Sequence, residues 1–350
     1  MHAQTVRLAS LLGAVLLWTP FAASTAQAPD DGDSTPWVRY EGSSGPGEGT
    51  HIVLVSGDEE YRSEEALPML GKILAVRHGF TCTVLFPIDP ETGMVEPDHQ
   101  TNIPGLEQLD SADLMVLFTR FRELPPDQME HIDAYTRSGR PIIGLRTATH
   151  AFQYKRNPDS PYAKYDWQSE VEGWNGGYGR QVLGETWVTH HGTHGEESTR
   201  GLVNGLRQDR PILNGVADVW GPTDVYGLRD IEGDADVLLY GQSLSGMEPS
   251  APPNTSKSIL PVAWTKRYET ETGNRARVFT TTMGASVDLE SEDLRRLLVN
   301  AAYWAVGLED SIPEEADVRY VDPYAPTAFG FDEHREGLRP SDFALENSGR

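Results

Sequence analysis

Three histidines lie close together in the second half of the chain. His190, His191 and His194 fall within five positions, and two acids follow at Glu196 and Glu197. Neutral imidazoles and carboxylates are the usual ligands of zinc and of chemically similar metals. Adjacent residues at a strand end point to opposite faces, so at most two of the histidines converge easily. The segment predicts a divalent, zinc-like metal site of His190, His191 and His194. The alternative is a hydrogen-bonding pair that lines a pocket or caps a strand.

The segment Gly144–Ala148 has the pattern of a nucleophile elbow, in which small residues flank one exposed side chain on a tight strand-to-helix turn. The exposed position holds Arg146. Arginine stays protonated at ordinary pH, so Arg146 cannot serve as a nucleophile or a base. We expect it to clamp a carboxylate or to stabilise negative charge that develops on a sugar oxygen. The alternative is a structural ion pair with one of the acids.

Two further polar segments follow apolar runs that we interpret as parallel strands. Asp58–Arg62 follows His51–Val55, and Arg120–Glu123 follows Asp113–Thr119. The carboxyl ends of such strands meet at one edge of the sheet, where ligands bind in doubly wound folds. The alternative is that surface turns are polar in any case. The residues predicted to bind substrate at this edge are Asp58, Glu59, Tyr61, Arg62, Arg120 and Arg122.

Histidine titrates near neutral pH, so we predict that His150 and His190 transfer protons, with Arg146 as the third catalytic residue. His150 is also a further candidate metal ligand. Aromatic residues gather between residues 162 and 187, and we assign Trp174 among them to substrate binding. Flat rings beside polar groups suit carbohydrate. The alternative is that these rings fill the core beneath a long insertion.

Short apolar runs alternate with amphipathic stretches, which predicts an α/β fold with a doubly wound, mostly parallel sheet. The helices expected are residues 64–78, a helix around Met129–Tyr135 that stops at Gly139, and one that starts at Ser291 and ends at Gly307. The strands expected are 51–55, 80–86, 113–119, 141–145, 186–189, 237–240, 259–264 and 277–282.

The ends of the chain differ in composition from its middle. Residues 1–28 have the pattern of a signal peptide: Arg7, an apolar run over Leu11–Phe21, and Ala26-Gln27-Ala28 before the expected cleavage. We therefore predict a secreted or periplasmic protein without a membrane span after cleavage. We expect a disordered linker over 29–48, one domain over 49–308 and an irregular tail over 309–350.

The formal net charge of −24 argues against a nucleic-acid partner, because a phosphate backbone would be repelled. Cys82 is the single cysteine, so the chain cannot form an internal disulfide. It lies in the apolar run Phe80–Leu85, where we expect a buried, unreactive thiol.

Four motifs together resemble the ThuA-like family of trehalose utilisation, and more narrowly its secreted branch from planctomycete-type bacteria. They are Ser56–Arg62, Gly144–Phe152, His190-His191-Gly192 and Arg277–Gly284, and the likeness covers His51 to Gly307. The resemblance implies a flavodoxin-like fold of the class I glutamine amidotransferase kind and a link to the catabolism of sugars and their 3-keto derivatives.

The chain departs from that pattern at two positions. Arg146 stands where amidotransferases keep a cysteine, so glutaminase activity is not expected. Ala285 follows Gly284, where many family members have a histidine, so any role of that histidine is absent or has moved to His150, His190 or His191. We expect an enzyme that acts on a sugar or a 3-keto sugar glycoside by acid/base chemistry, with a metal as the one cofactor suggested. The alternative is a sugar-binding or sensing protein without catalysis.

Overall fold

The computed structural model describes Met1, residues 35–231 and residues 233–346. Its main element is a sheet of ten strands in the order β1-β3-β2-β4-β5-β12-β11-β10-β7-β8. The five strands β3, β2, β4, β5 and β12 are parallel. Their bounds are Thr81–Leu85, His51–Gly57, Leu114–Thr119, Ile142–Leu145 and Arg275–Thr281. The predicted α/β fold with a parallel sheet is therefore confirmed for this part.

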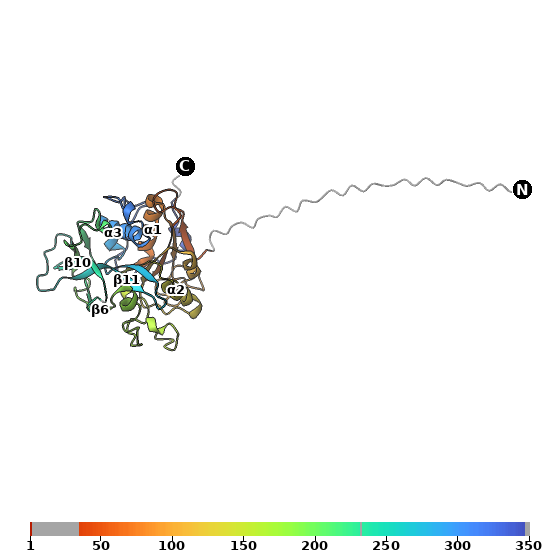
Figure 1. The fold of residues 1–350 in the computed structure, drawn as a ribbon, viewed down its shortest axis with the longest axis horizontal. Coiled ribbons are helices and arrows are strands. Elements are labelled where there is room, and N and C mark those ends of the chain that lie inside the picture. The colour runs from red at the N-terminus through yellow and green to blue at the C-terminus, as the bar shows by residue number, and fades with distance from the viewer. Residues whose placement is uncertain (2–34, 232, 347–350) are drawn as a thin grey trace. The chain divides into compact units, whose positions relative to one another are not determined.

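Helices cover both faces of the parallel strands. Alternate residues of β2 point to opposite faces: Ile52 and Leu54 belong to one hydrophobic cluster, and Val53 and Val55 to the other. The first cluster includes residues of α1 (Ser63–His78) and α3 (Glu292–Ala305), and the second includes residues of α2 (Pro126–Ser138). In Figure 1, α1 and α3 lie next to each other, and α2 lies apart from them.

The sheet continues beyond β12 as an antiparallel extension. Its strands are β11 (Leu260–Glu269), β10 (Asp236–Leu244), β7 (Ser198–Val203) and β8 (Val219–Gly221). A separate two-stranded sheet joins β6 (Trp187–His190) to β9 (Tyr226–Leu228), and its register places His190 opposite Tyr226.

Strand β1 (Trp37–Tyr40) falls inside the range 29–48, where we expected a disordered linker. It pairs antiparallel with β3, and Tyr40 is buried. The Tyr40 hydroxyl donates a hydrogen bond to the carbonyl of Phe343, 2.8 Å away. The apolar side chains of this short segment therefore attach it to the sheet edge despite its glycine-rich surroundings.

We call residues 309–346 the C-terminal segment. It contains two short 3-10 helices, Glu309–Ser311 and Pro340–Phe343, with irregular chain between them. Its aromatic residues Tyr320, Tyr324, Phe329 and Phe343 pack against the α1 and α3 side of the core. The expected signal peptide of residues 1–28 lies outside the described residues, apart from Met1. Among the described residues, no helix has the length and apolar character needed to cross a membrane.

Candidate active site

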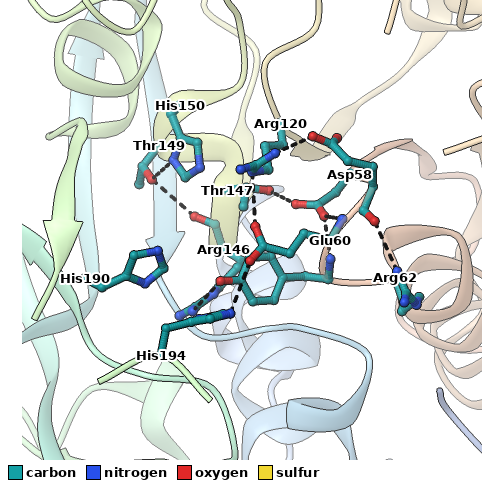
Figure 2. Close-up of polar contacts among 12 residues, drawn as sticks. Asp58, Glu60, Arg62, Arg120, Arg146, Thr147, Thr149, His150, His190 and His194 are labelled. Carbon is teal, nitrogen blue, oxygen red and sulfur yellow. Dashed lines mark hydrogen bonds and ion pairs between the residues drawn. The ribbon is translucent and has the colours of Figure 1, made fainter. Parts of the chain in front are cut away.

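Asp58 is the first residue after β2, and its carboxylate is used to build the turn that follows. Oδ1 accepts the backbone N–H groups of Glu60 at 2.7 Å and Tyr61 at 2.5 Å. Oδ2 accepts the hydroxyl of Thr147, which lies in the turn after β5 (Figure 2). Asp58 is fully buried. Its role here is to join two strand ends, and both of its oxygens already have donors.

Glu59 forms ion pairs with two arginines that follow β4. Oε1 pairs with Arg120 and Oε2 pairs with Arg122. Arg122 is completely buried, and its NH1 group donates to the carbonyls of Pro97 at 2.9 Å and His99 at 3.2 Å. Arg122 therefore holds the loop after β3 against the site, and Glu59 balances its charge.

Arg120 remains partly accessible and contacts a second acid, because its Nε atom lies 3.2 Å from Oε2 of Glu60. Burial raises the pKa of Glu60 despite the nearby charge of Arg120. The other oxygen of Glu60 lies 3.4 Å from Nε2 of His194, so Glu60 lies between Arg120 and His194 (Figure 2).

Arg146 occupies the elbow after β5 with φ of +43°, a left-handed backbone conformation that residues other than glycine rarely adopt. Its guanidinium lies between two rings, 4.4 Å from the centroid of Tyr61 and 3.8 Å from that of Tyr226. It donates to the carbonyls of Asp224 at 2.8 Å and Thr282 at 2.7 Å, and it pairs with Oδ1 of Asp224 at 3.0 Å. Arg146 is fully buried, so it acts on the site through Asp224.

Asp224 joins two of the predicted histidines. Its Oδ2 atom lies 2.9 Å from Nδ1 of His190, and its Oδ1 atom lies 3.2 Å from Nδ1 of His194. Burial by itself would raise the pKa of Asp224, but hydrogen bonds from His190 and His194 and the charge of Arg146 outweigh it. The pKa of Asp224 therefore lies well below its usual range.

The charge of Asp224 fixes the orientation of both imidazoles. A carboxylate only accepts hydrogen bonds, so each Nδ1 must donate to it. When neutral, each ring then carries its lone pair on Nε2 and can accept a proton or bind a metal there. The two ring centroids are 4.8 Å apart, and each histidine side chain is 35% exposed. One ligand atom from each of His190, His194 and Asp224 lies within 4.8 Å of the others, so these residues could hold a metal ion.

His150 lies beside this group in an aromatic environment. Its ring is 5.0 Å from Phe121, 5.1 Å from Trp187 and 5.8 Å from Tyr226, measured between centroids. Burial lowers the pKa of His150 well below its usual value, and the positive charges of Arg120 and Arg146 add to this effect. His150 is therefore a neutral imidazole at ordinary pH.

Three predicted site residues point elsewhere. The Nε2 atom of His191 lies 2.9 Å from the carbonyl of Ser258, away from the His190 and His194 pair. Arg62 is buried and donates to Thr327 of the C-terminal segment at 3.1 Å. Trp174 packs edge-on against Tyr165, with ring centroids 4.8 Å apart, in the cluster on the α2 side of the sheet.

The C-terminal segment covers part of the site. Phe329 stacks on Tyr61 with centroids 5.7 Å apart and lies 5.2 Å from the ring of His194. The next residue donates its N–H group to the carbonyl of Glu60 at 2.8 Å, and Phe331 lies over Arg120. The site is thus formed by the turns after several strands together with the C-terminal segment, whose Phe329 is more than a hundred residues beyond His194 in the sequence.

Asp224, Glu60 and Phe329 were not among the predicted site residues. Glu60 lies within a segment that was recognised as polar, so its position was the available signal. Asp224 stands alone between Thr223 and Val225, and no motif marks it. It reaches His190 because β6 pairs with β9, a contact between residues far apart in the sequence.

Comparison with known proteins gives one family. The model of the family described as ThuA, trehalose utilisation, matches residues 53–305. Similar solved structures include a protein described as ThuA-like from Parabacteroides merdae ATCC 43184, with 16% identity, a TM-score of 0.46, and coverage of 73% of this chain and 90% of that chain. Another described as ThuA-like, from Bacteroides uniformis ATCC 8492, has 13% identity, a TM-score of 0.45, and coverage of 76% and 95% respectively. No curated protein matches this chain.

Proposed function

This chain belongs to the ThuA family of trehalose utilisation, and from that premise we propose that it is a carbohydrate-active enzyme using acid/base chemistry. The substrate class we propose is a sugar or a 3-keto sugar glycoside. The observation that carries the proposal is Asp224, a buried carboxylate that orients His190 and His194 so that both Nε2 atoms face away from it. The carboxyl group of Glu60 lies 3.4 Å from Nε2 of His194.

His190 is the proposed base. A carboxylate that accepts the Nδ1 hydrogen of an imidazole holds the ring in one tautomer and stabilises the imidazolium that forms when Nε2 takes a proton. Arg146 keeps Asp224 charged and in position. This assigns Arg146 a positioning role in place of the substrate contact that we first expected, because solvent does not reach it.

Glu60 is the proposed acid, since its raised pKa favours a protonated carboxyl that can donate. In a 3-keto glycoside the carbonyl acidifies the hydrogen on C2. His190 would remove that proton, and the electron pair would form the C1=C2 bond as the C1–O bond breaks. Glu60 would protonate the departing oxygen, and addition of water across C1=C2 would complete hydrolysis. Arg120, which is partly accessible, would stabilise negative charge on the substrate.

The aromatic residues near the histidines support a carbohydrate ligand. Trp187 contacts the rings of both His150 and His190, and Trp167 packs against Trp187. Both tryptophans line a cleft of about 310 Å³ that also contains Gln168, Asn175 and Arg229. Rings combined with amide and guanidinium groups can stack on a sugar and hydrogen-bond its hydroxyls.

As an alternative use of the same imidazoles, we propose a divalent, zinc-like metal held by His190 and His194, with Asp224 as the group that orients both rings. With a metal bound, His190 would be a ligand and would not act as the base. A bound metal would polarise a substrate carbonyl. Metal analysis of protein purified without chelators tests this. A metal content that falls by about one equivalent per chain in His190→Asn supports the proposal, and equal content in both proteins contradicts it.

Activity is tested by incubating the purified protein with glucosides, trehalose and their 3-keto forms, with and without added divalent metals, and by analysing the products. We expect His190→Asn and Asp224→Asn to lower kcat by about 10²- to 10⁴-fold, because each removes the oriented base. His191→Asn is the matched control and should retain activity, since His191 bonds to Ser258 instead. Absence of turnover with every substrate would contradict the proposal.

A sugar-binding protein without catalysis is the second candidate, and the cleft beside Trp167 and Trp187 favours it. A thermal-shift panel of the same sugars separates the two. Stabilisation by a sugar that is never converted would indicate a binding protein.

Three finer assignments complete the proposal. The helices on both faces of the parallel strands support a doubly wound, flavodoxin-like arrangement of the class I amidotransferase kind, with Arg146 in place of the cysteine. The pattern of residues 1–28 supports export to the periplasm or the medium and the secreted, planctomycete-type branch. Sequencing the N-terminus of the exported protein should give Pro29 first, and an intact Met1 would contradict cleavage.

A further inference from the structure

A second group of metal-ligating side chains lies outside the site described above. Glu96 and Asp98 are in the loop that follows β3, and His334 is in the C-terminal segment. One ligand atom from each of the three lies within 4.8 Å of the others. The group therefore joins two segments that are more than two hundred residues apart in the sequence.

His334 is the unusual member of this group. Its side chain is only 8% exposed, and neither ring nitrogen has a hydrogen-bond partner among the described residues. A buried polar group without a partner is costly, and native proteins almost always satisfy such groups. The Nε2 atom lies 3.4 Å from Oε1 of Glu96 without the geometry of a hydrogen bond, so the imidazole points at the carboxylates.

The two acids are arranged to receive a ligand from the solvent side. The side chain of Glu96 is about one-third exposed, and Asp98 is exposed. Oε1 of Glu96 accepts the N–H group of Asp98 at 3.2 Å, which leaves its Oε2 atom and both carboxylate oxygens of Asp98 available. The buried cation Arg122 lies in the neighbourhood, but Glu59 already balances its charge.

We propose that Glu96, Asp98 and His334 bind a divalent first-row transition cation such as Zn²⁺ or Mn²⁺. One imidazole nitrogen with two carboxylates suits these ions, whereas Ca²⁺ and Mg²⁺ prefer sites made only of oxygen. The cation gives His334 the partner that it lacks. This site is independent of the catalytic proposal and of the His190 and His194 pair.

The position of the site gives the cation a structural role. In the loop that carries Glu96, the N–H group of Val95 donates to the carbonyl of Leu338 in the C-terminal segment at 2.8 Å. The carbonyls of Pro97 and His99 in the same loop accept hydrogen bonds from Arg122. His334 follows shortly after Phe329 and Phe331, which cover Tyr61 and Arg120. A cation bound here fastens the cover of the candidate active site to the sheet.

The experiment uses a His190→Ala/His194→Ala background, which removes the histidine ligands of the other candidate site. After treatment with chelator, the protein is dialysed against ZnCl₂ or MnCl₂, and bound metal is measured by mass spectrometry. We expect one equivalent to remain in this background, and His334→Ala or Asp98→Asn to raise the Kd at least tenfold. His131→Ala is the matched control, since His131 pairs with Asp110 in another part of the surface and should leave binding unchanged.

Hydrogen exchange supplies a second readout. The cation should slow exchange over residues 327–339 in the background protein and should have no such effect in the Asp98→Asn variant. Asp98 is exposed, so this variant keeps the test valid if His334→Ala fails to fold. The proposal is overturned if the background protein binds neither metal, or if His334→Ala and Asp98→Asn bind it as tightly as the background does.

Discussion

Arg146 is a cation that solvent does not reach, and its charge is balanced by Asp224 and by the faces of two tyrosine rings. Removing Arg146 leaves buried Asp224 with only its two histidine partners and leaves the carbonyls of Asp224 and Thr282 without this donor. Breaking a buried ion pair by removing one partner costs about 3–5 kcal/mol. We therefore expect Arg146→Met to lower the free energy of unfolding by about that amount, measured by urea denaturation at pH 7. Arg275→Met removes an exposed arginine that pairs with Glu269, and it should cost less than about 1 kcal/mol. Similar losses in the two variants would show that the Arg146 pair is not important for stability.

Glu64 is a second buried ionisable residue, and unlike Arg146 it has no ion-pair partner among the described residues. Neither carboxylate oxygen has a hydrogen-bond partner among the described residues. Burial raises the pKa of Glu64 to about 8 from an ordinary value of 4.5. The folded protein therefore holds this proton more tightly than the unfolded chain does. The stability that the proton contributes is complete below pH 4.5 and is lost as the pH rises from 4.5 to 8.

Glu64→Gln removes this titration while keeping the size of the side chain. The variant should gain stability over the unchanged protein by about 1.4 kcal/mol for each pH unit between 4.5 and 8, and no more above pH 8. Urea denaturation at pH 5, 6, 7 and 8 measures this difference. Glu107→Gln, at an exposed position, is the control and should show no such trend. A difference that stays constant with pH would mean that Glu64 is ionised in the folded protein.

At the scale of elements, the part of the C-terminal segment around Phe329 shields the site from solvent. The ring of Phe329 contacts His194 and Tyr61. Phe329→Ala should therefore expose the imidazole of His194 and make it react faster with diethylpyrocarbonate. Modification is followed by mass spectrometry of the peptide that contains His194. The variant should lose about 1 kcal/mol of stability, less than the ~1.5–3 kcal/mol of a fully buried phenylalanine. Phe331→Ala is the control, because Phe331 contacts Arg120 and not His194. Equal reactivity in both variants would argue against shielding by Phe329.

The elements that the sequence predicted are those whose signal is local. The strands β2, β4 and β5 are apolar runs bounded by polar turns, and α3 repeats Leu294, Leu297, Leu298 and Ala301 at helical spacing, all of them buried. The strands that were missed depend on distant partners. β7 is a polar segment that becomes a strand only between β10 and β8. β1 is a run of only four residues in a stretch otherwise rich in glycine, serine and acids, and it is a strand because it pairs with β3.

The candidate site divides in the same way. The turns after β2, β4 and β5 were predicted because chain direction alone brings them to one edge of the sheet. Asp224 could not be predicted, since its contact with His190 depends on the pairing of β6 with β9. The burial of a side chain also could not be predicted from its residue type. Arg62, Arg122 and Arg146 were expected to line the site as charged, accessible side chains, but the structure buries all three completely.

Within the molecule as a whole, the site lies where the parallel part of the ten-stranded sheet meets the small sheet of β6 and β9. Glu60, Arg120 and Arg146 come from turns of the parallel strands, whereas His190 and Asp224 come from the segment that includes the small sheet of β6 and β9. Arg146 spans the junction, because it donates both to Thr282 after β12 and to Asp224. Relative movement of the two parts would separate the proposed base His190 from the proposed acid Glu60, and Arg146 resists that movement.

The net charge of the protein destabilises the folded state, whereas the ion pairs and hydrogen bonds of the site stabilise it. The formal net charge is −24, so the excess acidic side chains repel one another, and this repulsion favours expanded states over the compact fold. Salt screens this repulsion, since the Debye length falls from about 30 Å at 0.01 M to about 8 Å at 0.15 M ionic strength. We therefore expect the Tm to rise between 10 and 150 mM NaCl at pH 7, by roughly 2–4 °C for each kcal/mol of repulsion relieved. Scanning calorimetry measures the change, and glycerol added at 10 mM NaCl distinguishes it from a general effect of cosolutes. The surface ion pairs weaken in the same range of salt, so a Tm that falls would mean that their loss exceeds the relief of net repulsion.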